Sequence, residues 1–208
     1  MHIISFFEPP LLENSFILYD DLNCYIIDPS SKYDDIVRFI ENNKLKPIGI
    51  LNTHGHFDHI KYNDKLKKYF SIKVFAHENE IENIKNTKVY AEYFKFQMED
   101  VSLPDEYLKD GDKLYLNSVE IKVIETFGHT AGSICFYLEN NNVIFTGDTL
   151  FKKSFGRTDL PGGDFDLMKN SIKKLFSLKD ETVVYCGHGV KTTIKDEKRD
   201  NIFLKYLW

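Results

Sequence analysis

Apolar residues in the first quarter of the chain recur at strand spacing and then at helix spacing. Residues 15–19 and 24–27 are apolar runs joined by residues 20–23, whose Asp and Asn side chains are typical of a hairpin turn. Apolar positions at helical spacing then predict a helix over residues 33–42. A short apolar strand over residues 47–51 follows, and it leads directly into a cluster of histidines.

The central part of the chain continues this pattern with one interruption. Residues 73–76 form a further predicted strand, and a polar helical stretch covers residues 78–85. Residues 87–110 show no clear periodicity, so we expect an irregular insertion there. Two more hairpins follow, 113–116 with 120–126 and 133–138 with 143–145, the second closing on an Asn-rich turn.

The C-terminal part is predicted to hold two helices and a strand. Asp164 is placed to cap a helix with apolar residues at helical spacing. A last strand over residues 182–185 precedes a helix that carries Ile202, Phe203 and Tyr206. Two sheets packed face to face, with helices on their outer faces, would accommodate this order of elements.

The composition fits a globular protein of 208 residues with a substantial core, since 42% of the residues are apolar and 14% are aromatic. The net charge of −5 provides no overall attraction for nucleic acid or an anionic membrane, and we expect neither as a partner. No apolar run has the length of a membrane span, and residues 1–10 lack the cationic start of a signal peptide. Cys24, Cys135 and Cys186 are expected as buried reduced thiols, which fits a cytoplasmic enzyme.

Histidine and aspartate residues gather in four short segments, each of which follows an apolar strand. Residues 53–59 read Thr-His-Gly-His-Phe-Asp-His, and the other segments are Gly128-His129-Thr130, Gly147-Asp148-Thr149 and Gly187-His188-Gly189. Imidazole and carboxylate groups are suitable ligands for zinc, manganese and iron. Seven such groups are too many for one tetrahedral ion and about right for two ions that share a carboxylate. Loops at strand ends can converge on one edge of a sandwich, so we expect a two-metal hydrolytic site there.

These motifs resemble those of the metallo-β-lactamase superfamily, and the match extends over nearly the whole chain. The resemblance implies an α+β fold, a four-layer αββα sandwich formed by residues 1–208 as a single domain. It implies that His54, His56 and His129 hold one metal, that Asp58, His59 and His188 hold a second, and that Asp148 bridges the two. We therefore expect two divalent ions, zinc ahead of iron or manganese.

Within the superfamily, residues 128–133, 145–151 and 156–164 resemble the type II glyoxalases, or hydroxyacylglutathione hydrolases. The ending from Thr192 to Leu204 is similar to the short bacterial branch of that group. The resemblance implies hydrolysis of a small-molecule thioester such as S-lactoylglutathione to a hydroxy acid and a thiol, by attack of a metal-bridging hydroxide that Asp58 orients. Only 20 residues follow His188, whereas longer glyoxalases carry a helical C-terminal domain that helps to hold glutathione. We therefore expect weakened binding of glutathione.

The same residues are compatible with a second function. Persulfide dioxygenases belong to this superfamily and hold one ferrous ion through two histidines and an aspartate, which would be His54, His129 and Asp148 here. Because those enzymes keep most of the remaining motif, the ligand residues alone do not separate the two functions. Residues 156–164 and the C-terminal ending favour the hydrolase.

Several residues near the motifs have simpler interpretations. Arg157 is either a solvated loop residue or a contact for a substrate carboxylate. His2 and His77 are expected to be structural or exposed. The basic run Lys65, Lys67 and Lys68 is expected to be a solvated helix face rather than a nucleic-acid patch.

Overall fold

The computed structural model describes residues 1–206, and its longer strands form two mixed six-stranded sheets. In spatial order, the first sheet consists of β1 (His2–Glu8), β2 (Glu13–Tyr19), β3 (Asn23–Ile27), β4 (Lys46–Leu51), β5 (Val74–His77) and β6 (Glu106–Leu108). The second consists of β14 (Thr192–Thr193), β13 (Val183–Cys186), β10 (Val143–Gly147), β9 (Ile134–Leu138), β8 (Val119–Glu125) and β7 (Lys113–Leu116). Strands β11 (Leu150–Phe151) and β12 (Ser154–Phe155) form a small separate ribbon.

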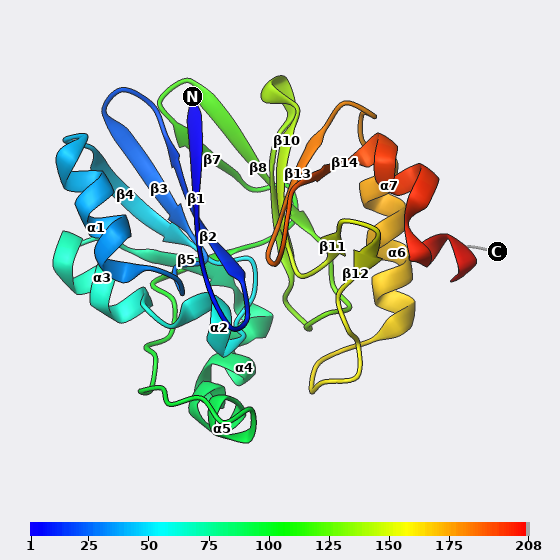
Figure 1. Ribbon diagram of the computed structural model, residues 1–208, viewed down its shortest axis with the longest axis horizontal. Coiled ribbons are helices and arrows are strands. Elements are labelled where there is room, and N and C mark those ends of the chain that lie inside the picture. The colour runs from blue at the N-terminus through cyan, green and yellow to red at the C-terminus, as the bar shows by residue number, and fades with distance from the viewer. Residues whose placement is uncertain (207–208) are drawn as a thin grey trace.

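Helices cover the outer faces of both sheets and produce the αββα sandwich that the motifs implied (Figure 1). The first sheet is covered by α1 (Tyr33–Asn42) and α3 (Asn63–Phe70), and the second by α6 (Phe165–Phe176) and α7 (Ile194–Asp200). Three short helices, α2 (Phe57–Ile60), α4 (Ile81–Lys85) and α5 (Thr87–Tyr93), gather at one end of the sandwich (Figure 1). The 3₁₀ turns are η1 (Glu78–Glu80), η2 (Glu139–Asn141) and η3 (Ile202–Tyr206).

The layers follow from strands that are apolar on both faces. In β2, Phe16 and Leu18 pack between the sheets, whereas Ile17 packs outward among residues of α1 and α3. In β9, Phe136 lies in the same inter-sheet core, and the neighbouring Tyr137 packs against α6. Because successive strand side chains point to opposite faces, each such strand needs an apolar layer on either side.

The predicted cap of α6 is present. The Asp164 side chain accepts a hydrogen bond of 2.9 Å from the Leu167 amide, so one of the orphan N–H groups at the start of this helix has a partner. The helix turns Met168 and Ile172 toward the second sheet, as their spacing predicted.

The structure differs from the sequence-based elements in three places. Strand β1 was not predicted, because it is an edge strand in which no residue is buried. The expected irregular insertion at 87–110 was wrong in part, since it contains α5 and β6. The helix expected around Ile202 is the 3₁₀ turn η3, and the α-helix precedes it as α7.

His77 and the lysines of α3 lie outside the proposed site, as the sequence analysis expected. His77 is buried and accepts a hydrogen bond from the Asn79 amide at the start of η1, so its role is structural. On α3, Lys67 pairs with Asp105 at 2.6 Å, and the Lys65 ammonium lies 3.5 Å from the Tyr33 ring centroid. No helix within residues 1–206 has the length and apolar character needed to cross a membrane.

All three cysteines are free and buried, and burial raises the pKa of each thiol to about 12. We expect no reaction with a thiol reagent at pH 8 in the folded protein and reaction of three thiols after unfolding in guanidinium, because the thiolate is the reactive form. Ser118→Cys, at an exposed position, is the positive control and should react at once. Rapid modification of a native thiol would contradict the burial.

Candidate metal centre

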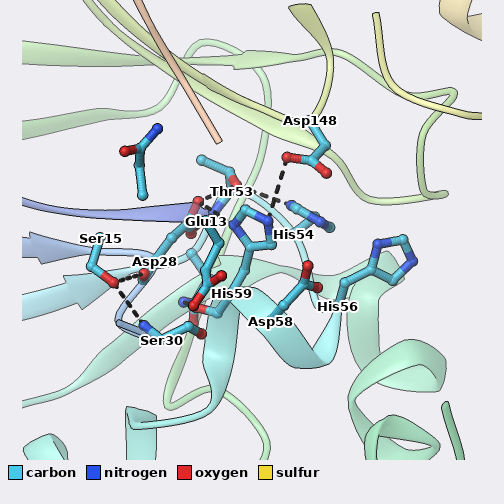
Figure 2. A network of polar contacts seen from close by, with 12 residues as sticks. Glu13, Ser15, Asp28, Ser30, Thr53, His54, His56, Asp58, His59 and Asp148 are labelled. Atoms are coloured by element: carbon cyan, nitrogen blue, oxygen red, sulfur yellow. Dashed lines mark hydrogen bonds and ion pairs between the residues drawn. The ribbon is translucent and has the colours of Figure 1, made fainter. Parts of the chain in front are cut away.

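The seven predicted ligands meet at one end of the sandwich, in the loops that leave β4, β8, β10 and β13. Figure 2 shows His54, His56, Asp58, His59 and Asp148 facing the same small volume. The apolar strands end at neighbouring positions of the two sheets, so their polar loops are carried to the same edge. The structure thus brings together residues that are far apart in the sequence.

His54, His56 and His129 form the first group of donors. Their candidate ligand atoms lie within 4.8 Å of one another, and all three side chains are buried. His129 Nε2 lies 2.9 Å from His56 Nδ1. Burial, together with the neighbouring imidazoles, holds the pKa of His54 well below its usual value and lowers that of His56 to about 3. Both rings are therefore neutral at pH 7, which is the form that binds a metal.

Asp58, His59 and His188 form the second group. His188 Nε2 lies 3.4 Å from Asp58 Oδ2 and 3.3 Å from His59 Nε2. Burial by itself would lower the pKa of His188, but the nearby Asp148 and Asp58 carboxylates raise it to about 9. The Asp148 and Asp58 carboxylates therefore place negative charge next to the His188 imidazole.

Asp148 lies between the two groups and contacts both. Its Oδ1 is 3.4 Å from His59 Nε2, and its Oδ2 is 3.6 Å from His129 Nε2 and 3.5 Å from His188 Nε2. Burial alone would raise the pKa of Asp148, yet the imidazoles of His188 and His59 hold it well below its usual range. An ionised carboxylate in this position is suited to bridging two cations.

The donor set fits a pair of metal ions. Among the described residues, His54 Nε2 and Asp148 Oδ1 are buried without a hydrogen-bond partner, a situation that native structures usually avoid. Imidazole nitrogens also lie 2.9 Å and 3.3 Å apart, and at these distances a proton or a metal ion must lie between them, because two lone pairs would repel. Neutral imidazoles with a shared carboxylate are the chemistry of a zinc, iron or manganese site.

The second nitrogen of three ligand rings is held by a fixed acceptor. Asp28 Oδ2 lies 3.2 Å from His59 Nδ1, and Asp28 also accepts hydrogen bonds from the amide and hydroxyl of Thr53 (Figure 2). The backbone oxygens of Arg157 and Leu11 lie 2.8 Å from His129 Nδ1 and 2.9 Å from His188 Nδ1. Such partners set the tautomer that directs Nε2 at a metal.

Asp28 was not among the predicted site residues. It is an acid directly after an apolar strand, which is the same signal that marked the ligands, but it stands alone rather than in a motif.

Glu80 is a second residue that the sequence did not reveal. Its buried carboxylate accepts hydrogen bonds of 2.7 Å from the amides of both Gly55 and Gly132, and it also contacts the Thr130 hydroxyl. Gly55 lies between two ligands of the first group, and Thr130 follows the third. Glu80 therefore ties together the two loops that form this group.

At Gly187 and Gly156, two positions next to the proposed ligands, space rather than backbone conformation requires glycine. A Cβ at Gly187 would lie 2.2 Å from Asp148 Oδ1 and 2.9 Å from His59 Cε1. At Gly156 it would lie 1.8 Å from the Asp148 backbone oxygen. Larger residues at either position would displace a ligand.

The Arg157 guanidinium forms a two-point ion pair with Asp159, at 2.6 Å and 2.7 Å. About half of the Arg157 side chain is exposed. A substrate carboxylate would have to compete with Asp159 for this cation. What the residue supplies within the structure itself is its backbone oxygen, which holds His129.

A cleft of about 530 Å³ opens above the proposed metal ligands. Its floor contains His56, Asp58, His129 and Asp148, and one rim carries Arg157 and Asp159 with Leu160 and Pro161. Another part of the lining, the apolar wall, is formed by apolar and aromatic residues of α5 and of the segments next to it. The site thus combines a charged floor with a mainly apolar wall.

The model of the metallo-β-lactamase superfamily matches residues 9–188, and the chain belongs to this superfamily. The chain is 33% identical over 197 residues to a probable metallo-hydrolase, YqgX, of Bacillus subtilis, covering 94% of this chain and 93% of the relative. It is 35% identical over 196 residues to the hydroxyacylglutathione hydrolase GloC of Haemophilus influenzae, covering 92% of each. These relatives support a metal-dependent hydrolase.

Two solved structures resemble the fold closely. The BLEG-1 B3 metallo-β-lactamase superposes with a TM-score of 0.90 at 33% identity, covering 98% of this chain and 99% of that one. TTHA1623, determined in a di-iron-bound form, gives a TM-score of 0.90 at 31% identity, covering 96% and 99%. The αββα fold is therefore that of the superfamily, which has a dinuclear metal site.

We expect Glu80→Gln to weaken both stability and the first metal group. The amide would direct a donor at the Gly55 or Gly132 amide, leaving a buried N–H without an acceptor at a cost of about 1–3 kcal/mol. Urea denaturation measures the loss, and metal titration measures the affinity. Glu78→Gln, exposed on the same 3₁₀ turn, should leave both unchanged. Equal behaviour of the two variants would refute the role of Glu80 in holding the two loops together.

We also expect different metal losses in Asp148→Asn and His188→Ala. A neutral amide is a poor bridge between cations, so the Asp148 variant should lose affinity at both sites. The His188 variant should chiefly empty the second. Metal analysis after dialysis against a weak chelator separates the two patterns, and Asp166→Asn is a surface control. Similar, independent losses in both variants would contradict the bridging role of Asp148.

Proposed function

We propose that this protein hydrolyses a small-molecule thioester at a dinuclear metal site. The observation that carries the proposal is the complete pair of donor groups, joined by Asp148 and open to the cleft. The motif loops resemble those of hydroxyacylglutathione hydrolases, and a 35% identical relative bears that name. The proposed ligands are those expected from the sequence, and zinc is the proposed metal, with iron or manganese as alternatives.

Two bound ions would supply a nucleophilic water of lowered pKa and a Lewis acid for the carbonyl oxygen. The residues of the chain then position the reactants. Burial would raise the pKa of Asp58, but its contact with His188 lowers it, so the carboxylate is ionised. Asp58 also lines the cleft, and from this position it orients the attacking water and takes its proton. A thiolate leaves readily, so the reaction does not require a strong general acid.

The alternative is a mononuclear iron persulfide dioxygenase that uses His54, His129 and Asp148. The di-iron form of TTHA1623 fits iron as the metal here. The ligand residues are compatible with both functions, and the similarity of residues 156–164 and of the C-terminal ending to hydroxyacylglutathione hydrolases favours the hydrolase. Asp58, His59 and His188 are also in place with their outer partners, as a second ion would require.

We expect the purified protein to hold close to two transition-metal ions per chain and to hydrolyse thioesters, S-lactoylglutathione among them. Activity should disappear on chelation and return on addition of Zn²⁺, Mn²⁺ or Fe²⁺. Metal analysis and release of free thiol measure the two properties. One iron per chain with persulfide-dependent oxygen uptake would establish the dioxygenase instead. Cleavage of a β-lactam without cleavage of any thioester would also overturn the proposal.

A further inference from the structure

The apolar wall of the cleft is an aromatic surface that begins next to the proposed metal ligands. Phe57 lies between the proposed ligands His56 and Asp58 in the sequence. Its ring stacks on Phe94 with centroids 5.9 Å apart, and it lies 5.5 Å from the ring of Phe96. Tyr93 packs edge-on against Phe94. A continuous apolar surface therefore runs from the floor of the site to helix α5.

Helix α5 turns its large apolar side chains to the cleft rather than to the core. Thr87 and Ala91 are its buried residues, and both are small. Val89 and Tyr93, one turn apart, are 61% and 77% exposed and line the cleft. Exposed apolar residues in contiguous patches mark binding surfaces more often than isolated ones do. This helix is thus built to cover a ligand, and that also explains why its periodicity was not evident in the sequence.

The cleft offers little to a charged substrate apart from the metal floor. Among the described residues that line it, Arg157 is the sole Lys or Arg side chain, and Asp159 neutralises it through two short contacts. Glutathione carries two carboxylates, and neither would meet an uncompensated side-chain cation on these walls. An uncharged apolar group would bury area against the aromatic surface without leaving a carboxylate unpaired.

We propose that the preferred substrate is a thioester that carries an uncharged apolar group, of phenyl or medium-chain alkyl size, packed on the Phe57–Val89–Tyr93–Phe94 wall. The inference rests on the proposed thioester hydrolysis and specifies its substrate class. The apolar group belongs either to the acyl part or to the thiol part of the substrate. In both cases an apolar group packs against the wall.

The test compares thioesters that differ in one group, using the metal-loaded enzyme. Acetyl, phenylacetyl and octanoyl thioesters of N-acetylcysteamine vary the acyl side, and acetyl thioesters of benzyl mercaptan and N-acetylcysteamine vary the thiol side. A matched glutathione series adds the carboxylates. We expect kcat/KM to rise about 10-fold or more with the apolar group on one of the two sides. Glutathione should give no gain over N-acetylcysteamine.

Variants locate the effect on the wall. Tyr93→Ser and Val89→Ser should lower kcat/KM for the phenylacetyl or octanoyl substrate far more than for the acetyl substrate, and their exposure makes misfolding no explanation. Glu92→Ala, exposed on α5 away from the cleft lining, is the control. Asp159→Asn releases Arg157, so it should lower KM for glutathione thioesters and not for neutral ones.

Distinct outcomes separate the failure of this inference from that of the proposed function. If no thioester is cleaved, the hydrolase assignment fails. If thioesters are cleaved with no dependence on apolar size, or if glutathione thioesters are preferred 10-fold, the inference alone is overturned. Self-association that Tyr93→Ser abolishes without any kinetic effect would assign the wall to a second copy of the chain, and it too would overturn the inference.

Discussion

The mutual repulsion of buried donor atoms is the constraint around which this structure is organised. Imidazole nitrogens of His56 and His129, and of His59 and His188, face one another at 2.9 Å and 3.3 Å beside the Asp148 carboxylate. Such an arrangement is favourable only when protons or metal ions lie among these atoms, because buried polar atoms otherwise lose their hydration without compensation. The site therefore depends on surroundings stiff enough to hold these atoms together against their own repulsion.

That stiffness comes from hydrogen-bond acceptors that lie behind the proposed ligands, two of them buried carboxylates. Asp28 holds the His59 ring and the Thr53 backbone, and Glu80 joins the two loops of the first donor group. Backbone oxygens of Arg157 and Leu11 hold two further rings. These four residues come from different parts of the chain, so the orientation of the ligands relies on the whole sandwich rather than on any one loop. The dense packing around Gly187 leaves the ligands little freedom to move.

At this edge of the fold, different elements carry the groups proposed for catalysis and the groups proposed to select the substrate. The floor is built from the ends of central strands, which both sheets support, and it carries the groups that would act on the reacting bond. The wall is built from Phe57 and from α5, in the stretch between β5 and β6. A short helix with only small buried residues can change its outer face without disturbing the core. Substrate preference could therefore diverge among relatives while the metal floor stayed the same.

Local periodicity and motif spacing were enough to predict much of this protein. The strands that are apolar on both faces, the capped helix after Asp164 and the loops that carry the proposed ligands follow from residues close together in the sequence, and the αββα fold followed from the family resemblance. Strand β1 was missed because none of its residues is buried, and helix α5 because its buried positions, Thr87 and Ala91, are small and its large apolar residues line the cleft instead. The tertiary structure alone placed Asp28 behind His59 and Glu80 between Gly55 and Gly132, and it paired Arg157 with Asp159. A buried polar group finds its hydrogen-bond partners only after packing has brought distant loops together and fixed their side-chain rotamers. No local pattern in the sequence records which partners those will be.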